Sequence, residues 1–207
     1  MFVNQVAFNN PISRMQAIGT DTRPEKAVVD LKGNPLIRPR TGGMYQPVRY
    51  ELPAGTILFR FVGQGTPIKN AVTGGWWVEQ SQFQIISNFS QKMGIGVALA
   101  ARLLCCVPPE WSDMGLLIRV KVQEPLLAYR GLGNSVSTPA KDSLGNVEMT
   151  AHNDIAARRL YQLFIPGLFD YAKRTPDRKL PGAMVVENQW PIKKEEANKG
   201  WLYLKQS

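Results

Sequence analysis

The sequence has few of the residues on which common hydrolytic and metal-dependent sites rely. It contains one histidine, His152, and two adjacent cysteines, Cys105 and Cys106. A Ser-His-Asp triad would need that single histidine, which we predict to cap a helix or face solvent at a helix start, where positive charge is disfavoured. Zinc sites need several histidine or cysteine ligands at defined spacings, so we expect no metal site.

Disulfides, long apolar runs and phosphate-binding loops are also missing. Neighbouring cysteines rarely pair with each other, so we interpret both as buried thiols in a reducing, cytoplasmic environment. The longest apolar stretch, Ile95 to Val107, is interrupted by Arg102 and is too short to cross a bilayer. The first five residues do not resemble a signal peptide. Gly131-Leu132-Gly133 lacks the third glycine of a dinucleotide-binding fingerprint. We therefore expect no membrane association.

The chain is basic, with 25 lysines and arginines against 16 acidic residues and a net charge of +9 among 207 residues. No run reaches five like charges, which argues against a dedicated basic tail. This charge permits contact with nucleic acid, an anionic cofactor or an acidic partner, without choosing among them. We interpret the turn-rich residues 1–50 as an irregular lead-in and residues 51–207 as the domain.

Short strands and two helices in mixed order predict the α+β fold class. The predicted strands are residues 27–31, 54–62, 76–78, 116–122, 126–129, 182–187 and 201–204. The predicted helices run from about residue 91, after an N-cap at Ser90, to residue 106 and from residue 153 or 154 to residue 164. Residues 83–87 suit either a strand or a helix, and residues 134–150 are predicted to form a loop.

Residues 51–77 contain the most informative pattern. Arg60 lies inside an apolar strand, where a charge is rarely buried without a partner. Gly63 allows a sharp turn directly afterwards, and Gly74-Gly75 precede the pair Trp76-Trp77. A cation, an approachable backbone and an aromatic surface together suit a small anionic ligand that contains an aromatic ring. The alternative interpretation is an edge-strand arginine reaching solvent and two core tryptophans.

Leu52-Pro53-Ala54-Gly55-Thr56-Ile57-Leu58-Phe59-Arg60-Phe61 resembles the opening strand of the ADP-ribosyltransferase superfamily, including its toxin and NAD-hydrolysing branches. Residues 120–131 are similar to a later strand and turn of the same branches. The resemblance covers residues 51–204. It implies an ADP-ribosyltransferase-like split β-sandwich that consumes NAD and transfers ADP-ribose to a macromolecule or to water. It also implies a cytoplasmic protein, or an effector delivered into a target cell.

The resemblance assigns roles to particular residues. Arg60 matches the arginine that holds the NAD phosphates or the nicotinamide ribose, and one of the aromatic residues stacks on nicotinamide. Glu187 matches the late-strand catalytic glutamate, which stabilises positive charge on the ribose. The expected cofactor-binding residues are Arg60, Gly63, Trp76, Trp77, Phe83 and Ser87. Without the resemblance, Glu187 is an ordinary strand-end glutamate in water.

Two motifs of the superfamily are missing. Only Ser87-Asn88-Phe89-Ser90 stands near the expected Ser-Thr-Ser motif, and Glu187-Asn188-Gln189 replaces the Glu-x-Glu pattern. These departures weigh against arginine-directed transfer and leave open a non-catalytic copy. Two further hypotheses remain. One is a non-enzymatic binder of nucleic acid or protein, such as a phage or bacterial accessory or inhibitor protein, and the other is an assembly protein with an irregular N-terminal arm.

Overall fold

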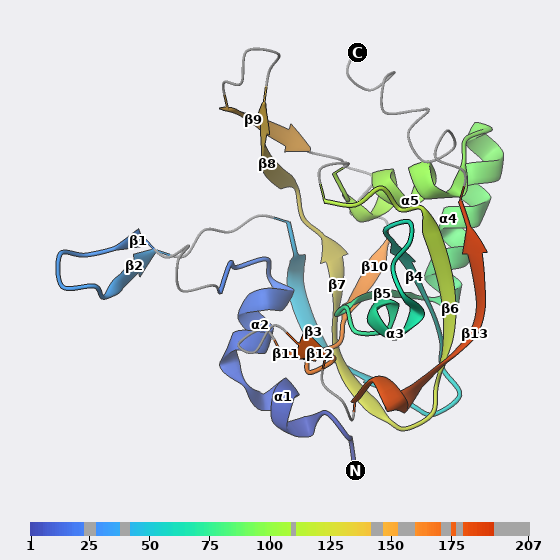
Figure 1. Ribbon diagram of the computed structural model, residues 1–207, viewed down its shortest axis with the longest axis horizontal. Helices are drawn as coiled ribbons and strands as arrows, with labels where there is room; N and C mark the ends of the chain where they lie inside the picture. The colour runs from blue at the N-terminus through green and yellow to red at the C-terminus, as the bar shows by residue number, and fades with distance from the viewer. Residues whose placement is uncertain are drawn as a thin grey trace.

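The computed structural model describes residues 1–22, 28–37, 42–108, 111–141, 147–152, 160–170, 175–176 and 180–192 (Figure 1). The helices are α1 (Gln5–Asn9), α2 (Pro11–Ala17), α3 (Ile68–Ala71), α4 (Gln80–Met93), α5 (Val97–Cys105) and the 3-10 turn η3 (Leu180–Ala183). The strands are β1 (Val28–Val29), β2 (Pro35–Ile37), β3 (Met44–Leu52), β4 (Ile57–Val62), β5 (Trp76–Glu79), β6 (Leu116–Val122), β7 (Leu126–Gly133), β8 (Val136–Lys141), β9 (Val147–His152), β10 (Tyr161–Phe164), β11 (Phe169–Asp170), β12 (Thr175–Pro176) and β13 (Met184–Pro191).

Seven strands form one sheet in the order β13-β6-β4-β5-β10-β7-β3, and every neighbouring pair is antiparallel. The pairs β1–β2, β8–β9 and β11–β12 form separate two-stranded sheets. Figure 1 shows the β1–β2 and β8–β9 hairpins extending away from the large sheet. Helices and an antiparallel sheet together make this an α+β fold.

The large sheet curls around one apolar core. Side chains alternate between the two faces of a strand, and one face buries Leu58 on β4 and Leu163 on β10. The same cluster includes Leu52 from β3 and Met184 from β13, which are the two outermost strands of the sheet. A flat sheet would hold those strands far apart, so their shared core requires strong curvature.

Two separate helical layers cover the outer face of this sheet. The α4–α5 layer packs Ile86 and Leu104 against Phe59 on β4. The α1–α2 layer packs Phe8 on the Tyr129 ring of β7, with ring centroids 4.4 Å apart. The two layers lie on different sides of the molecule in Figure 1. A strip of β4, β5 and β10 lies between the layers, and this strip contributes to the cavity described below.

The N-terminal segment is part of the fold, so our interpretation of residues 1–50 as an irregular lead-in is wrong for their described part. The Asn4 side chain is buried and donates to the carbonyls of Leu127 and Pro166, at 2.8 and 3.1 Å. The Asn10 side chain accepts from the Ile12 N–H at 3.0 Å and so caps α2. Asn10-Pro11, which lies in the segment that we interpreted as turn-rich, therefore marks a helix start.

The predicted strands at residues 54–62, 76–78, 116–122 and 126–129 are confirmed as β4, β5, β6 and β7, with shifts at their ends. The predicted helix over residues 153–164 is wrong at its end, where Tyr161–Phe164 form β10, and residues 153–159 lie outside the described residues. Residues 134–150 contain β8 and most of β9, although we predicted a loop. The predicted strand at residues 201–204 lies outside the described residues.

The predicted helix over residues 91–106 is divided in two. Gly94 adopts a left-handed conformation with φ of 62° and ends α4. Ser90, predicted as an N-cap, instead lies in the last turn of α4, where its hydroxyl donates to the Ile95 carbonyl at 2.6 Å. Residues 83–87, which suited a strand or a helix, belong to α4.

Candidate functional site

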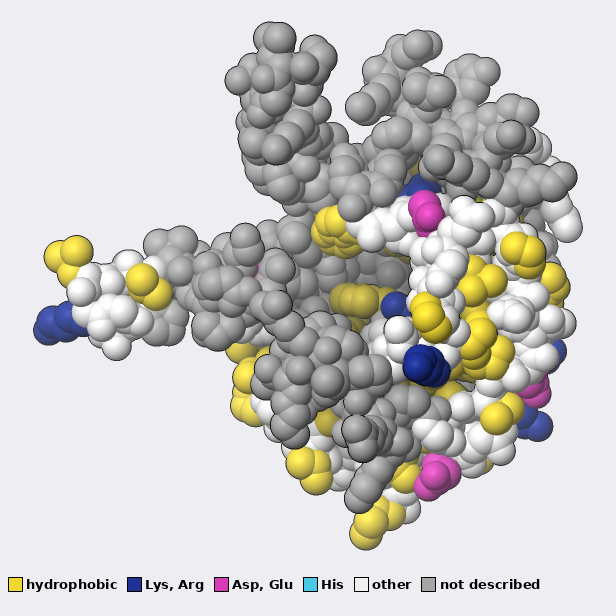
Figure 2. Space-filling model, viewed as in Figure 1, with side chains coloured by type: hydrophobic (Ala, Val, Ile, Leu, Met, Phe, Trp, Pro, Cys, Tyr) yellow, Lys and Arg dark blue, Asp and Glu magenta, His cyan; other side chains and the backbone are white. Residues whose placement is uncertain are grey.

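A cavity of about 550 Å³ is hollowed into the molecule, and this volume is typical of small-molecule sites. Figure 2, which views the molecule from the same direction as Figure 1, shows a hollow with hydrophobic side chains inside it and a basic side chain at its edge. The described residues that line the cavity are Gln16, Gly19, Thr20, Asp21, Thr22, Gly43, Phe59, Arg60, Phe61, Trp76, Trp77, Val78, Cys105, Cys106, Val107, Trp111, Ser112, Met114, Asn134, Val136, Gln162 and Phe164. They come from the ends of α2 and α5 and the segments after them, from β4, β5 and β10, and from positions at the start of β3 and around the junction of β7 and β8.

The two predicted tryptophans both line the cavity but differ in how deeply they are buried. Trp77 is 2% exposed and belongs to the apolar core, and its indole N–H donates to the Gly74 carbonyl at 2.7 Å. Trp76 is half-buried and leans on the Phe164 ring at a centroid distance of 5.2 Å. Trp77 is therefore a fixed wall, whereas Trp76 offers a surface on which a ligand ring can stack.

Arg60 is one of the lining residues, and its guanidinium is held on the core face of β4 beside Trp77. The group donates to the Ala71 carbonyl and lies 5.7 Å from the centroid of the Trp77 ring. A Cβ atom on Gly74 would overlap it, at 1.8 Å from a guanidinium nitrogen. A Cβ atom on Gly75 would lie 2.6 Å from the Phe164 ring. The tandem glycines thus make room for Arg60 and Phe164, which corrects our expectation that they admit a ligand.

The sequence analysis predicted none of the polar, uncharged or acidic residues of the lining, and Gln162 and Asp21 are among those it missed. Gln162 is 8% exposed and donates its amide N–H to the Cys105 carbonyl at 3.1 Å. Asp21 supplies the carboxylate in the described part of the lining. Gln162 fell within a predicted helix and Asp21 within the predicted lead-in. The one available signal was a glutamine inside the apolar run from residue 160 to residue 165.

Cys105, which lines the cavity, is a poor nucleophile. Burial, with a smaller effect of Cys106, raises the pKa of the Cys105 thiol to about 12. The thiol therefore stays protonated at neutral pH, and thiolate chemistry is suppressed. Among the described residues no group of three or more histidine, cysteine or acidic side chains could hold a metal ion.

Four of the predicted site residues lie outside the cavity lining. Gly63 follows β4, and a Cβ atom there would make only ordinary contacts, 3.5 Å from Asp113 and Thr66. Phe83 stacks on the Phe59 ring at 4.1 Å within the α4–α5 layer. Ser87 is half-buried on α4 and Glu187 is on β13. The cavity thus brings together Arg60, Trp76 and Trp77 from the predicted set.

Glu187 does not face Arg60. Strand β6 lies between β13 and β4, so our expectation that the strands carrying these two residues are neighbours is wrong. Glu187 pairs with Arg119 at 3.4 Å. Arg119 is opposite Phe59 in the sheet register and shares its face, whereas the side chain of Arg60 emerges on the other face.

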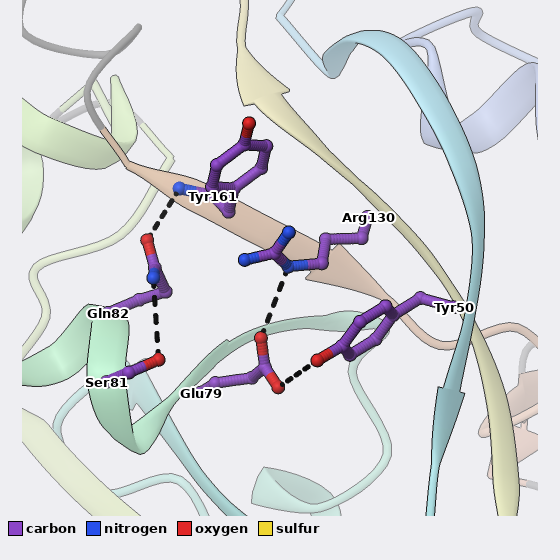
Figure 3. A network of polar contacts seen from close by, with 6 residues as sticks. All are labelled: Tyr50, Glu79, Ser81, Gln82, Arg130 and Tyr161. Atoms are coloured by element: carbon purple, nitrogen blue, oxygen red, sulfur yellow. Dashed lines mark hydrogen bonds and ion pairs between the residues drawn. The ribbon is translucent and has the colours of Figure 1, made fainter.

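A separate polar network, shown in Figure 3, joins β3, β5, β7 and β10. Glu79 accepts hydrogen bonds from the Tyr50 hydroxyl at 2.9 Å and from Arg130 Nε at 3.3 Å. The Arg130 guanidinium carbon lies 3.9 Å from the centroid of the Tyr161 ring. Burial and the neighbouring Glu79 raise the pKa of Tyr50. None of these four residues lines the cavity, so we interpret the network as a structural tie between strands.

No family model matches the chain. No curated protein matches it either. Among solved structures, Rhs1-CT in complex with cognate immunity protein RhsI1 is similar over 72% of this chain and 83% of its own, with 9% identity and a TM-score of 0.36. Tne2 in complex with Tni2 is similar over 72% of this chain and 95% of its own, with 15% identity and a TM-score of 0.35. Both TM-scores are below 0.5, so neither likeness defines the fold or the activity of this chain. No helix among the described residues is long and apolar enough to span a membrane.

Proposed function

We propose that the protein consumes NAD and transfers ADP-ribose to a macromolecule or to water. The observation that supports this is the cavity, whose lining includes Arg60 together with the aromatic residues Trp76, Trp77 and Phe164. NAD carries a pyrophosphate and two aromatic bases. A guanidinium binds phosphate oxygens through charge-assisted hydrogen bonds, and an indole such as Trp76 stacks on a base.

The reaction breaks the bond between the nicotinamide nitrogen and ribose C1. Nicotinamide leaves with the bonding electrons, and positive charge develops on the ribose. Water or a nucleophilic group of the target then attacks C1 and releases a proton. A carboxylate fixed beside that positive charge in a water-poor cavity lowers the activation barrier for cleavage of the nicotinamide–ribose bond. We assign this role to the Asp21 carboxylate, which lines the cavity, in place of Glu187, which pairs with Arg119.

The test is release of free nicotinamide from NAD by the purified chain. Arg60→Ala should mainly weaken NAD binding, whereas Asp21→Asn should leave binding largely intact and slow the chemistry roughly 10²–10³-fold. Arg119→Ala and Glu187→Gln are the matched controls, because their side chains lie outside the lining. A folded wild-type protein that neither binds nor cleaves NAD would refute the proposal. A loss of activity confined to Glu187→Gln would return the catalytic role to that residue.

The net charge of +9 favours a second candidate, which is binding of nucleic acid or another anionic macromolecule without catalysis. Binding that depends on phosphate contacts weakens steeply as salt concentration rises. Such binding to DNA or RNA, together with no nicotinamide release, would favour this candidate.

A further inference from the structure

The Gln162 side-chain amide is buried, and within the described structure only its Nε2 end makes a hydrogen bond. Its N–H binds the carbonyl of Cys105, the last residue of α5, where helix carbonyls have no partner within the helix. No described residue donates to its Oε1 atom. The side chain is 8% exposed and lines the cavity.

The bond to Cys105 sets the orientation of this amide. The Cys105 carbonyl is an acceptor and only the Nε2 end of the amide can donate, so Nε2 must point to Cys105 and Oε1 must take the other position. The neighbouring residue Leu163 belongs to the apolar core, so alternation places Gln162 on the outer face with Phe164. A buried acceptor without a partner is costly, and a ligand that supplies an N–H or O–H recovers that cost.

We infer that Gln162 is a specificity-determining residue that selects ligands with a hydrogen-bond donor at this position in the cavity. This inference rests on the proposed function, because NAD offers three kinds of donor, which are the nicotinamide carboxamide, the ribose hydroxyls and the adenine amino group. The carbonyl of Gln162 accepts from one of them, while α5 keeps the amide from turning.

The experiment measures the affinity of wild type, Gln162→Met and Gln162→Glu for NAD and for nicotinic acid adenine dinucleotide, by calorimetry. The second ligand has a carboxylate where NAD has its carboxamide and so lacks that donor. Gln162→Met has a similar volume and no acceptor, whereas Gln162→Glu keeps the acceptor. Thermal melting verifies that each variant is folded.

We expect Gln162→Met to bind NAD about tenfold more weakly than wild type, the loss of one hydrogen bond to a buried group. If the carboxamide is the donor, wild type prefers NAD over the acid and Gln162→Met loses that preference. If a ribose hydroxyl or the adenine amino group is the donor, Gln162→Met weakens both ligands equally. Gln162→Glu keeps an acceptor but cannot donate to the Cys105 carbonyl, so in either case it should bind NAD less tightly than wild type and more tightly than Gln162→Met.

Unchanged affinity of folded Gln162→Met for both ligands would overturn the inference while leaving the proposed function intact. Equal loss in Gln162→Met and Gln162→Glu would also overturn it, because the acceptor would then be irrelevant. If Gln162→Met does not fold, retained or lost NAD binding by Gln162→Glu decides the question. Wild type that does not bind NAD refutes the proposed function, and the inference falls with it.

Discussion

The two helical layers on the outer face of the sheet are held by different kinds of contact. The α4–α5 layer buries a broad apolar surface that includes Ile86 and Leu104. The α1–α2 layer buries fewer apolar residues and is also tied by polar contacts, including those of Asn4 and the Tyr129 hydroxyl, which donates to the Phe8 carbonyl at 3.1 Å. Both layers end at the cavity. A layer held by apolar burial can be predicted from apolar runs in the sequence. A layer held by single polar side chains leaves no such pattern.

Removing apolar volume from the α4–α5 layer should have the largest effect on stability. Ile86 is fully buried, and Ile86→Ala should lower the free energy of unfolding by about 2–5 kcal/mol through lost burial and a residual cavity. The adjacent Ile85 is 39% exposed, so Ile85→Ala is the matched control and should cost much less. Urea denaturation measures both values. Equal losses would show that this layer is not held by its apolar face.

Removing the polar tie of the α1–α2 layer should have the next largest effect. Asn4→Ala removes the partner of the Leu127 N–H and of the Leu127 and Pro166 carbonyls, so we expect a total loss of about 1–3 kcal/mol in the free energy of unfolding. Because Gly19 and Thr20 line the cavity, NAD binding should weaken as well. Asn9→Ala removes only an exposed side-chain hydrogen bond and serves as the control.

Urea denaturation and limited proteolysis of the N-terminal segment measure the Asn4→Ala effect. Protease should cut the variant near α1 and α2 before the rest of the chain, since local loss of the layer precedes global unfolding. Digestion at the wild-type rate would mean that apolar contacts alone hold both layers, and the difference between the layers would disappear.

A change in the strip between the layers should affect binding more than stability. Gly74→Ala displaces the end of the flexible Arg60 side chain, so we expect a folding cost below about 1 kcal/mol but roughly tenfold weaker NAD binding, from a lost hydrogen bond to a charged group. Gly63→Ala is the control, because a Cβ atom there meets nothing closer than 3.5 Å. Calorimetric titration with NAD distinguishes the two. Equal affinities would place the Arg60 guanidinium outside the binding site.

The smallest effect concerns pH and the end of α5. The pKa of Cys105 is raised from an ordinary value of 9.0 to about 12, so only the unfolded thiol loses its proton between these values. The unfolded chain then binds fewer protons, and stability falls as pH rises from 9.0 to about 12 but is unaffected below that window. Cys105→Ala should make this decline less steep in urea denaturation at several pH values. Identical slopes would contradict the burial of the thiol.

The sequence predicted the strands in which local pattern and final environment agree. Residues 116–122 alternate apolar and basic side chains, and the apolar ones enter the core of the sheet. The pattern failed at Tyr161–Phe164, where both faces of a short strand are covered and the apolar residues lose their alternation. It failed also at Asn10-Pro11, because the same dipeptide signals a turn and starts a helix.

For the candidate site, the sequence by itself determined Arg60 and Trp76, because a cation within an apolar strand and a tryptophan after two glycines are local signals. Only the tertiary structure decided that Asp21 and Gln162 join them. Their positions depend on contacts between segments far apart in the sequence, such as that of Asn4, in the N-terminal segment that also contains Asp21, with Leu127 and that of Gln162 with Cys105. The folded sheet also determined that Glu187 lies away from Arg60, because the order of the strands and the face on which each side chain emerges are properties of the sheet. Local sequence specifies which way a side chain points from its own strand, but not which strand lies next to it.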